Sequence, residues 1–319
     1  MSSVTATGKP AIKRKSRSPV VSWLKNAASS WQLYVLVLPA VVAVAVFNYF
    51  PMYGIQIAFK DFRPSLGIWG SNWVGLKHFI RFITFPDFQR VLRNTVGISL
   101  YSIATFPCAV ILALLINEIG NQKFKKTVQM ISYAPHFISV VVLCSMVRIF
   151  LARETGLINN LVSMLGAERV DFLAVPRYFS TIYVWSGVWQ GVGWGTIIYL
   201  ASLAGVSPEL VEAARIDGCN RLQIIQHINI PHILPTIIIL LILRTGSVLS
   251  VGFEKIFLLQ NPLNLGSSRV ISTYVYEMGI MGGQFSYSSA IGLFNNIVNI
   301  IFIMVVNTIA KRVSSVGLW

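Results

Sequence analysis

Arg244 has the most unusual chemistry for its place in the sequence, because it lies inside the long apolar run 232–253. Counted from His232 at about 1.5 Å per helical residue, it lies roughly 18 Å into a hydrocarbon core about 30 Å thick. A charge at that depth is costly and usually functional. A guanidinium that faces a water-filled path would bind a carboxylate through two parallel hydrogen bonds. Arg244 therefore predicts an acidic solute. Three structural roles stay open: bonding to backbone carbonyls, extension toward the membrane surface, and pairing with a neighbouring subunit.

The other reactive side chains form no catalytic or metal-binding pattern. His227 and His232 are five residues apart, whereas two residues four apart face the same side of a helix. The remaining candidates are scattered: Cys108, Cys144, Cys219, His78 and His136. The predicted apolar spans contain no Asp or Glu for a proton relay. The sequence therefore argues against a metal site, an intramembrane enzyme and a proton-coupled transporter.

Composition indicates that lipid is the solvent of this chain. Of its 319 residues, 55% are hydrophobic and 12% are charged, and the mean hydropathy is +0.67. Soluble domains carry about 25% charged residues. The formal net charge is +15, but many of the cations border apolar runs. That placement is typical of a membrane protein and not of a nucleic-acid-binding surface.

Six apolar runs are long enough to cross a membrane, which takes about 20 residues each. They lie at 33–52, 95–117, 127–150, 178–204, 232–253 and 286–310. Lipid offers the backbone no hydrogen-bond partner, and these runs are too long for barrel strands. The expected fold is therefore all-α, a polytopic protein with six transmembrane helices. Pro135 predicts a kink in the third.

The distribution of Lys and Arg predicts how the spans are oriented. Segment 1–30, the short loop 118–126 and the C-terminal tail all carry cations. We therefore expect both termini on the cytoplasmic side of the cytoplasmic membrane, with 1–30 as a basic segment and 31–319 as the membrane domain. Segment 54–93 is then external and rich in Trp and Phe. It is either an amphipathic helix at the interface or a helix packed on the span ends.

The cytoplasmic loop 206–231 predicts two short helices. Ser207 is a suitable N-cap and Pro208 suits the first helical position, while Gly218 suits the left-handed residue that ends a helix. A second helix is expected from Arg221 to Pro231. Such a polar helix–glycine–helix unit fits a docking element, although an ordinary helical loop stays open on these grounds alone.

Within this loop, Glu212-Ala213-Ala214, Gly218, Ile228 and Ile230-Pro231 resemble the EAA signature of binding-protein-dependent ABC importer permeases. The family pattern has Leu where this chain has Ile230. Two further stretches are similar to sugar permeases. Residues 73–95 resemble the segment that precedes the second span of sugar permeases, and residues 261–276 resemble the oligosaccharide subgroup, which includes alginate importers.

The resemblance implies a type I importer permease architecture and a set of partners. It implies a second homologous permease, two ATPase subunits and an extracytoplasmic solute-binding protein. It assigns the contact with the ATPase to Glu212, Ala213, Ala214, Asp217 and Gly218. This sequence has no GxxxxGK[ST] phosphate loop. ATP and Mg²⁺ would therefore bind to the separate ATPase, and we expect no cofactor and no catalysis in this chain.

Similarity to a maltose importer permease implies six residues on the solute path. These are Gln190, Gly191, Trp194, Arg244, Val248 and Val251. The two valines depart from the mostly polar family positions. In a continuous helix, 244, 248 and 251 would share one face. Asn295 and Asn299 in the last span either line the path or bond between helices.

The resulting expectation is a permease subunit that forms half of the path for an oligosaccharide, with an acidic solute of the uronic-acid type favoured by Arg244. A neutral oligosaccharide or a peptide-like solute is the alternative within this class. A structural or assembly membrane protein is the alternative from another class.

Overall fold

The computed structural model describes residues 30–314 and residue 317. The predicted basic segment 1–30 therefore lies outside the described residues, apart from Ser30. Contacts divide the chain into two compact units, Met1–Ile55 and Gln56–Trp319.

The first unit contains an apolar helix. α2 (Trp31–Val44) leads into a π-helical turn, η1 (Ala45–Tyr49), and then into the 3-10 stretch η2 (Phe50–Phe59), whose last residues belong to the second unit. None of the side chains of α2 is buried. A helix that is apolar all round and buries no side chain suits lipid. It corresponds to the first predicted span.

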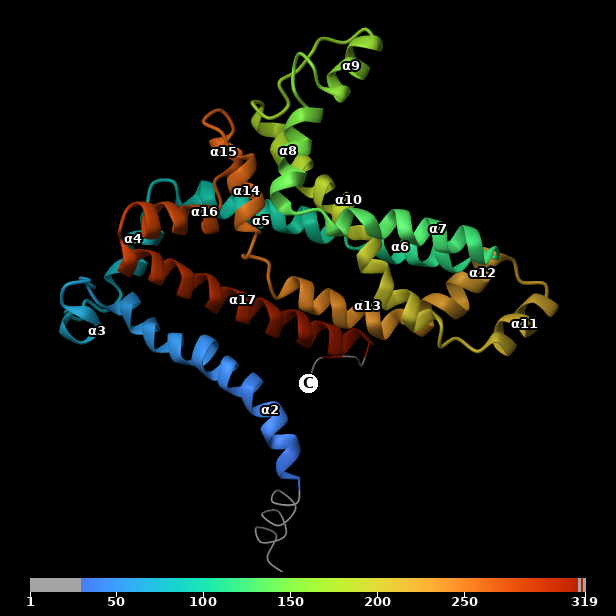
Figure 1. Cartoon of the computed structure of the whole chain (residues 1–319), viewed down its shortest axis with the longest axis horizontal. Helices are drawn as coiled ribbons and strands as arrows, with labels where there is room; N and C mark the ends of the chain where they lie inside the picture. The colour runs from blue at the N-terminus through green and yellow to red at the C-terminus, as the bar shows by residue number, and fades with distance from the viewer. Residues whose placement is uncertain (1–29, 315–316, 318–319) are drawn as a thin grey trace, which may run out of the picture. The chain divides into compact units, whose positions relative to one another are not determined.

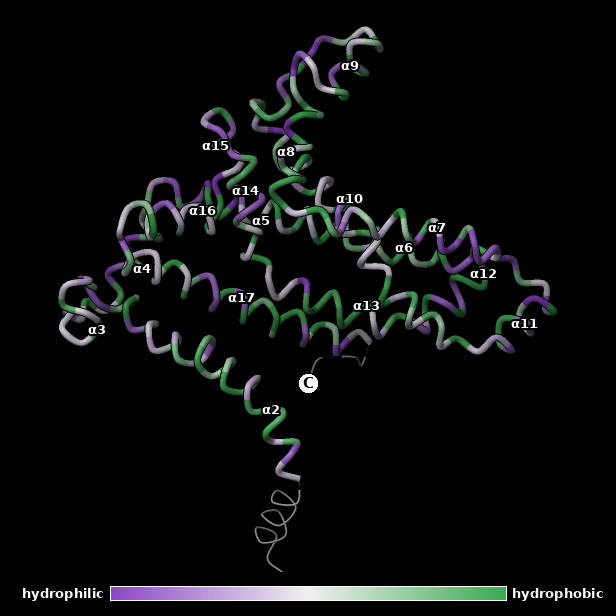
Figure 2. Tube along the Cα trace, viewed as in Figure 1, coloured by the Kyte–Doolittle hydropathy of each residue, from purple (hydrophilic) through white to green (hydrophobic). Residues whose placement is uncertain are grey.

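The second unit contains three further helices that are long and apolar enough to cross a membrane. α5 (Phe88–Ala104) and α6 (Pro107–Asn117) form one span. A second span runs through α12 (Arg221–Ile224), the π turn η4 (Ile225–Asn229) and α13 (Ile230–Thr245), and a third is α17 (Phe285–Ser314). Hydrophobic residues extend along α13 and α17 (Figure 2).

Two bent helix pairs raise the number of candidate spans from four to six. One pair is α7 (Gln122–Tyr133), extended by the 3-10 turn η3 (Ala134–Phe137), with α8 (Val140–Phe150), and the other is α10 (Pro176–Leu203) with α11 (Pro208–Ile216). Over the described residues the only extended pairing is one isolated bridge, between Lys60 and Trp73. The predicted all-α fold is confirmed over these residues, and the predicted six spans are reached when each bent pair counts as one span.

Shorter helices connect these spans. They are α3 (Gly67–Gly70), α4 (Lys77–Ile83), α9 (Leu157–Met164), α14 (Phe253–Leu259), α15 (Leu265–Ser268) and α16 (Ile271–Tyr276), which continues as the π turn η5 (Glu277–Met281). Within the second unit, α3, α4 and α16 lie at one end of α17, and α11 and α12 lie at the opposite end of the unit (Figure 1). The segment predicted to be external and the loop 206–231 are thus far apart.

The kink predicted at Pro135 is confirmed, and the change of direction there is large enough to divide the span into two helices. α7 and α8 meet at 99°, so the third span is not one continuous helix. The 3-10 turn η3 contains Pro135, and Ser139 begins α8 by accepting a hydrogen bond from the amide of Val142. A new N-cap and a proline together end the first helix and start a second in another direction.

The segment before α5 packs on the ends of the spans instead of forming a long interfacial helix. Phe82 of α4 is 1% exposed, and its ring lies 5.6 Å from that of Phe294 in α17. His78 is buried and hydrogen-bonds to the carbonyl of Lys60. Burial lowers the pKa of the His78 imidazole below its ordinary value. Of the two predicted arrangements for 54–93, the structure has the packed one.

The fifth helix ends earlier than predicted. α13 ends at Thr245, whereas the predicted span 232–253 continues for eight more residues. The amide of Leu249 bonds to Oδ1 of Asn299, 2.9 Å away on α17, and Nδ2 of Asn299 donates to the hydroxyl of Ser250. These bonds satisfy backbone and side chain outside a helix. The prediction that 244, 248 and 251 share one helix face is therefore wrong.

Replacing Gly193 by Ala is expected to destabilise the packing of α10 on α7. A β-carbon at this position would lie 2.0 Å from the carbonyl oxygen of Ser132, so the helices must separate. Overpacking of this kind costs about 1–3 kcal/mol. Gly191 is a matched control, because no atom lies within 4 Å of a β-carbon built there. Thermal unfolding in detergent should show a lower midpoint for Gly193→Ala than for Gly191→Ala, and equal midpoints would contradict this packing.

Candidate functional site

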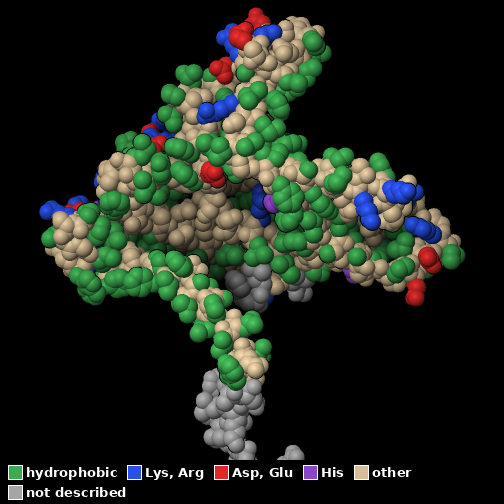
Figure 3. All heavy atoms as spheres, viewed as in Figure 1, with side chains coloured by type: hydrophobic (Ala, Val, Ile, Leu, Met, Phe, Trp, Pro, Cys, Tyr) green, Lys and Arg blue, Asp and Glu red, His purple; other side chains and the backbone are tan. Residues whose placement is uncertain are grey.

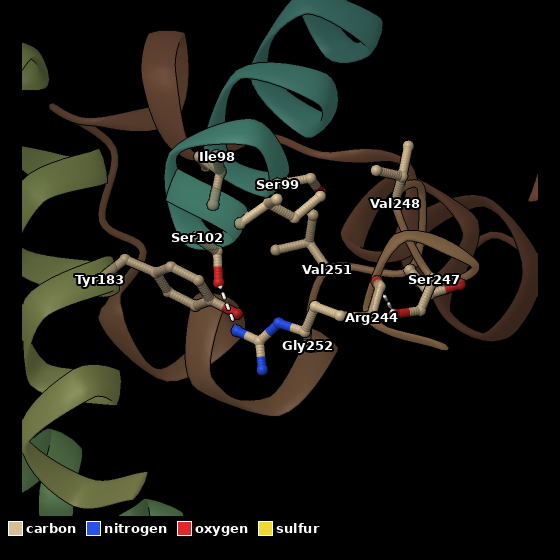
Figure 4. Close-up of a pocket in the computed structure, with 11 residues that line it drawn as sticks. Ile98, Ser99, Ser102, Tyr183, Arg244, Ser247, Val248, Val251 and Gly252 are labelled. Atoms are coloured by element: carbon tan, nitrogen blue, oxygen red, sulfur yellow. Dashed lines mark hydrogen bonds between the residues drawn. The ribbon is translucent and has the colours of Figure 1, made fainter. Parts of the chain in front are cut away.

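Arg244 lies in the last turn of α13, at the wall of a cavity of about 230 Å³. Its Nη2 donates a hydrogen bond to Oγ of Ser102 on α5, at 2.7 Å. The guanidinium lies beside Ser102 and the ring of Tyr183, which α10 supplies (Figure 4). None of the ion pairs found over the described ranges involves Arg244. A guanidinium has five N–H donors, so binding Ser102 leaves it able to hold a carboxylate.

A second cavity, of about 470 Å³, lies between α6, α10 and α13. It shares Ser102, Tyr183 and Arg244 with the first cavity, so the guanidinium lies where the two meet. The face drawn in Figure 3 is hollowed, with hydrophobic side chains around the hollow. A largely apolar wall with a few converging polar groups is typical of small-molecule sites.

Among the residues predicted on α10, the structure brings two to this second cavity. Gln190 and Gly191 line it, and Nε2 of Gln190 donates to the carbonyl of Ile138 at 2.7 Å. Trp194 lines neither cavity. Its ring stacks on His136, with centroids 4.4 Å apart and an interplanar angle of 6°. The structure thus brings Gln190, Gly191 and Arg244 to one cavity and leaves Trp194 outside both cavities.

The remaining predicted path residues lie around the turn that follows α13. Val248 and Val251 line the smaller cavity with Arg244, although both side chains are largely buried. Asn299 holds the turn through Leu249 and Ser250, and Asn295 donates to the same Ser250 hydroxyl at 3.5 Å. Neither asparagine lines either cavity. In place of a bond between helices, both side chains hydrogen-bond to the turn that follows α13.

Lys255 is a lining residue that the sequence analysis missed. It lies on α14 and lines the larger cavity together with Arg244. A lysine within the run FEKIFLL is a visible signal, but the predicted fifth span ended at 253, two residues before it. Among the described residues, no group of three or more His, Cys, Asp or Glu is arranged to hold a metal ion.

The loop 206–231 contains the first predicted short helix, α11, but the second one, expected from Arg221 to Pro231, is not separate, because α12 continues through η4 into α13. α11 begins with Ser207 at the N-cap position and Pro208 at the first helical position, although the hydroxyl of Ser207 makes no capping bond. Gly218 follows the helix with φ of +84°, a conformation that glycine adopts without strain. Asn220 then starts α12 through a reciprocal capping box with Gln223.

The surface of this loop is suited to contact with another protein. Of the five residues expected to contact the ATPase, Ala214 is half-buried. The other four are exposed: Glu212, Ala213, Asp217 and Gly218. Two large apolar side chains project beside them, Ile216 at 87% exposed and Leu222 at 73%. Lys and Arg side chains gather near the same end of the unit, with acidic side chains on α11 (Figure 3). Exposed apolar side chains within a polar rim are typical of an interface.

Comparison with known proteins gives matches over most of the chain. Residues 87–315 match the family described as binding-protein-dependent transport system inner membrane component. Protein LplB of Bacillus subtilis (strain 168) is 42% identical over 97% of this chain and 99% of its own length. The polygalacturonan/rhamnogalacturonan transport system permease protein YteP of the same organism is 44% identical over 90% of each chain.

A solved structure is also similar in fold. It is a bacterial alginate ABC transporter in complex with an alginate pentasaccharide-bound periplasmic protein. One of its chains has a TM-score of 0.85 and 38% sequence identity to this chain, covering 92% of this chain and 99% of its own length.

Proposed function

The chain belongs to the family of binding-protein-dependent transport system inner membrane components, and we propose that it is the permease subunit of an ABC importer for an acidic oligosaccharide. The observation that carries the acidic solute is the guanidinium of Arg244, which lies where two cavities meet and has no ion-pair partner among the described residues. A guanidinium with unused N–H donors at a cavity wall favours an anionic ligand, because it can hold a carboxylate through two parallel hydrogen bonds.

The named relatives support this solute class. YteP is described as a polygalacturonan/rhamnogalacturonan permease and the solved structure as an alginate transporter. Polygalacturonan and alginate are polymers of uronic acids, with one carboxylate on each sugar ring. An Arg side chain binds such a carboxylate bidentately. A neutral oligosaccharide or a peptide-like solute would leave this charge without a partner.

The partners proposed for the chain follow from its loop and its cavities. The exposed pair α11 and α12 would dock on a separate ATPase, of which the importer has two copies, and ATP with Mg²⁺ would bind there. Arg244 is exposed in the single chain, so a second, homologous permease would complete the path around it. An extracytoplasmic binding protein would deliver the solute at the opposite end. With 206–231 cytoplasmic, both termini are cytoplasmic as well.

Alternating access is the mechanism that this arrangement supports. ATP would close the ATPase pair, and the loop 206–231 would move with it as a rigid element. That movement would open the path toward the binding protein, and hydrolysis would restore the inward-facing state. A structural or assembly protein would need neither the docking loop nor the cavity at Arg244.

The test of the solute class is uptake into proteoliposomes that contain the assembled importer and its binding protein. Oligogalacturonides and their methyl esters have the same sugar rings and differ in charge. We expect uptake of the free acids to exceed that of the fully esterified sugars. Equal uptake of both would refute the acidic solute and leave the importer assignment standing.

A further inference from the structure

Lys255 is a buried cation on the wall of the larger cavity, which Arg244 also lines, and the proposed function does not yet assign it a role. Lys255 as a whole residue is only 9% exposed. Nζ donates to the carbonyl oxygen of Tyr183 at 2.8 Å and lies 4.8 Å from the centroid of the Tyr183 ring. The ion pairs of the described residues do not include Lys255. An ammonium group has three N–H donors, and its charge is left uncompensated here.

The ammonium lies at the wall of the larger cavity. Lys255 and Gly187 both line that cavity, and a β-carbon at Gly187 would lie 3.1 Å from Nζ. The ammonium thus lies close against the backbone of Gly187, where a β-carbon would make a tight contact with it. A buried lysine that only anchored α14 to α10 would not need to line a cavity.

Tyr183 contacts Lys255 directly and lies beside Arg244 (Figure 4). It lines both cavities, as Arg244 does, and its ring and carbonyl contact Lys255. Figure 4 shows the Tyr183 side chain beside the Arg244 guanidinium. The structure thus has two cations and the ring of Tyr183 on the wall of a single cavity of about 470 Å³. An aromatic ring offers a flat apolar surface with a polar end, which suits a sugar ring.

We propose that Lys255 and Arg244 form a two-point site that binds two carboxylates of one oligosaccharide, with Tyr183 contacting the sugar between them. This inference rests on the proposed acidic solute and deepens it. Arg244 would hold one carboxylate bidentately, and Lys255 would attract the other as a compact point charge. The consequence is a charge threshold: oligosaccharides with two or more free carboxylates are favoured over those with one.

The test uses galacturonate trisaccharides with one, two or three free carboxylates, the others being methyl esters. Uptake by the assembled importer is measured for wild type, Lys255→Met, Lys255→Gln and Lys255→Arg with the same binding protein. The ratio of variant to wild type is taken for each sugar, so discrimination by the binding protein cancels. Thermal unfolding reports whether each variant is folded.

For sugars with two or three carboxylates, we expect Lys255→Met and Lys255→Gln to lower uptake about tenfold, the effect of losing one charge-assisted contact. Uptake of the sugar with one carboxylate should fall by less than about twofold, because Arg244 alone can hold it. Lys255→Arg, which keeps the charge, should retain most uptake. An equal loss for all three sugars would overturn the inference and make Lys255 a purely structural anchor. Unchanged uptake of all three would also overturn it. If wild type itself shows no dependence on charge, the proposed acidic solute fails instead.

Discussion

Replacing Arg244 by Gln should lower the uptake of an acidic oligosaccharide by roughly tenfold to a hundredfold. The side chain lies where the two cavities meet, and its contact with Ser102 leaves donors for a solute. A hydrogen bond to a charged group contributes about 1.5–3 kcal/mol, and every 1.4 kcal/mol is about tenfold. Arg244→Lys keeps the positive charge but loses the planar guanidinium that binds a carboxylate bidentately. Uptake by Arg244→Lys should therefore lie between that of wild type and that of Arg244→Gln.

The matched control for this prediction is Arg177→Gln. Arg177 lies near the start of α10, lines neither cavity and stacks on the ring of Tyr178. Removing this cation should leave uptake close to that of wild type. If Arg177→Gln and Arg244→Gln reduce uptake of an acidic sugar equally, the effect is one of general charge and not of the cavity.

Replacing Gly218 by Pro should nearly abolish transport while the chain remains inserted in the membrane. Gly218 has φ of +84°, whereas proline is fixed near −65°. Its amide also bonds to the carbonyl of Arg215, at 3.1 Å, and proline has no amide hydrogen to donate. The direction in which α12 leaves α11 must then change, and the docking surface changes with it. We expect ATP hydrolysis to persist without coupled uptake.

Gly218→Asn serves as the control for that backbone effect. No atom lies within 4 Å of a β-carbon at this position, so the strain comes from φ alone. Asn tolerates positive φ better than other residues with side chains. Transport by Gly218→Asn should therefore exceed that of Gly218→Pro by a wide margin. Equal loss in both would show that the conformation at Gly218 does not determine coupling.

Charge reversal in the same loop should have a comparable effect. Glu212→Lys reverses an exposed carboxylate on α11 that the resemblance assigns to the ATPase contact. Losing one partner of an interfacial charge pair costs about 2–5 kcal/mol, which is at least about tenfold in coupling. Glu168→Lys makes the same charge change at an exposed site outside the loop. Uptake should fall for Glu212→Lys alone; loss in both variants would point to net charge.

The parts of the fold that depend on local rules could be predicted from the sequence. The start of α11 at Pro208 and the left-handed glycine at Gly218 follow from residue types at fixed positions. The break near Pro135 follows from the geometry of proline, although its angle of 99° does not. The six apolar runs were found because lipid demands about 20 residues per span.

The parts that depend on distant contacts could not be predicted. α13 ends at Thr245 because Asn299, on another helix, takes over the amide of Leu249. The sequence offered no sign of that bond, so 244, 248 and 251 were placed on one face. The sequence does not distinguish Gly191 from Gly193, because both lie in the same glycine-rich part of one span. In the structure only Gly193 lies against the backbone of Ser132. Lys255 lines the same cavity as Arg244 because the chain turns back after α13, and hydropathy does not predict that turn.

The most direct test of the central claim is ATP hydrolysis by the chain purified with its native partners. Hydrolysis is measured with the binding protein alone, with the binding protein and an acidic oligosaccharide, and with the binding protein and a neutral one. The account predicts co-purification of an ATPase whose activity rises with the acidic oligosaccharide and not with the neutral one. Stimulation by the neutral sugar alone would contradict the acidic path at Arg244. If no ATPase co-purifies, the assignment of α11 and α12 to coupling is contradicted.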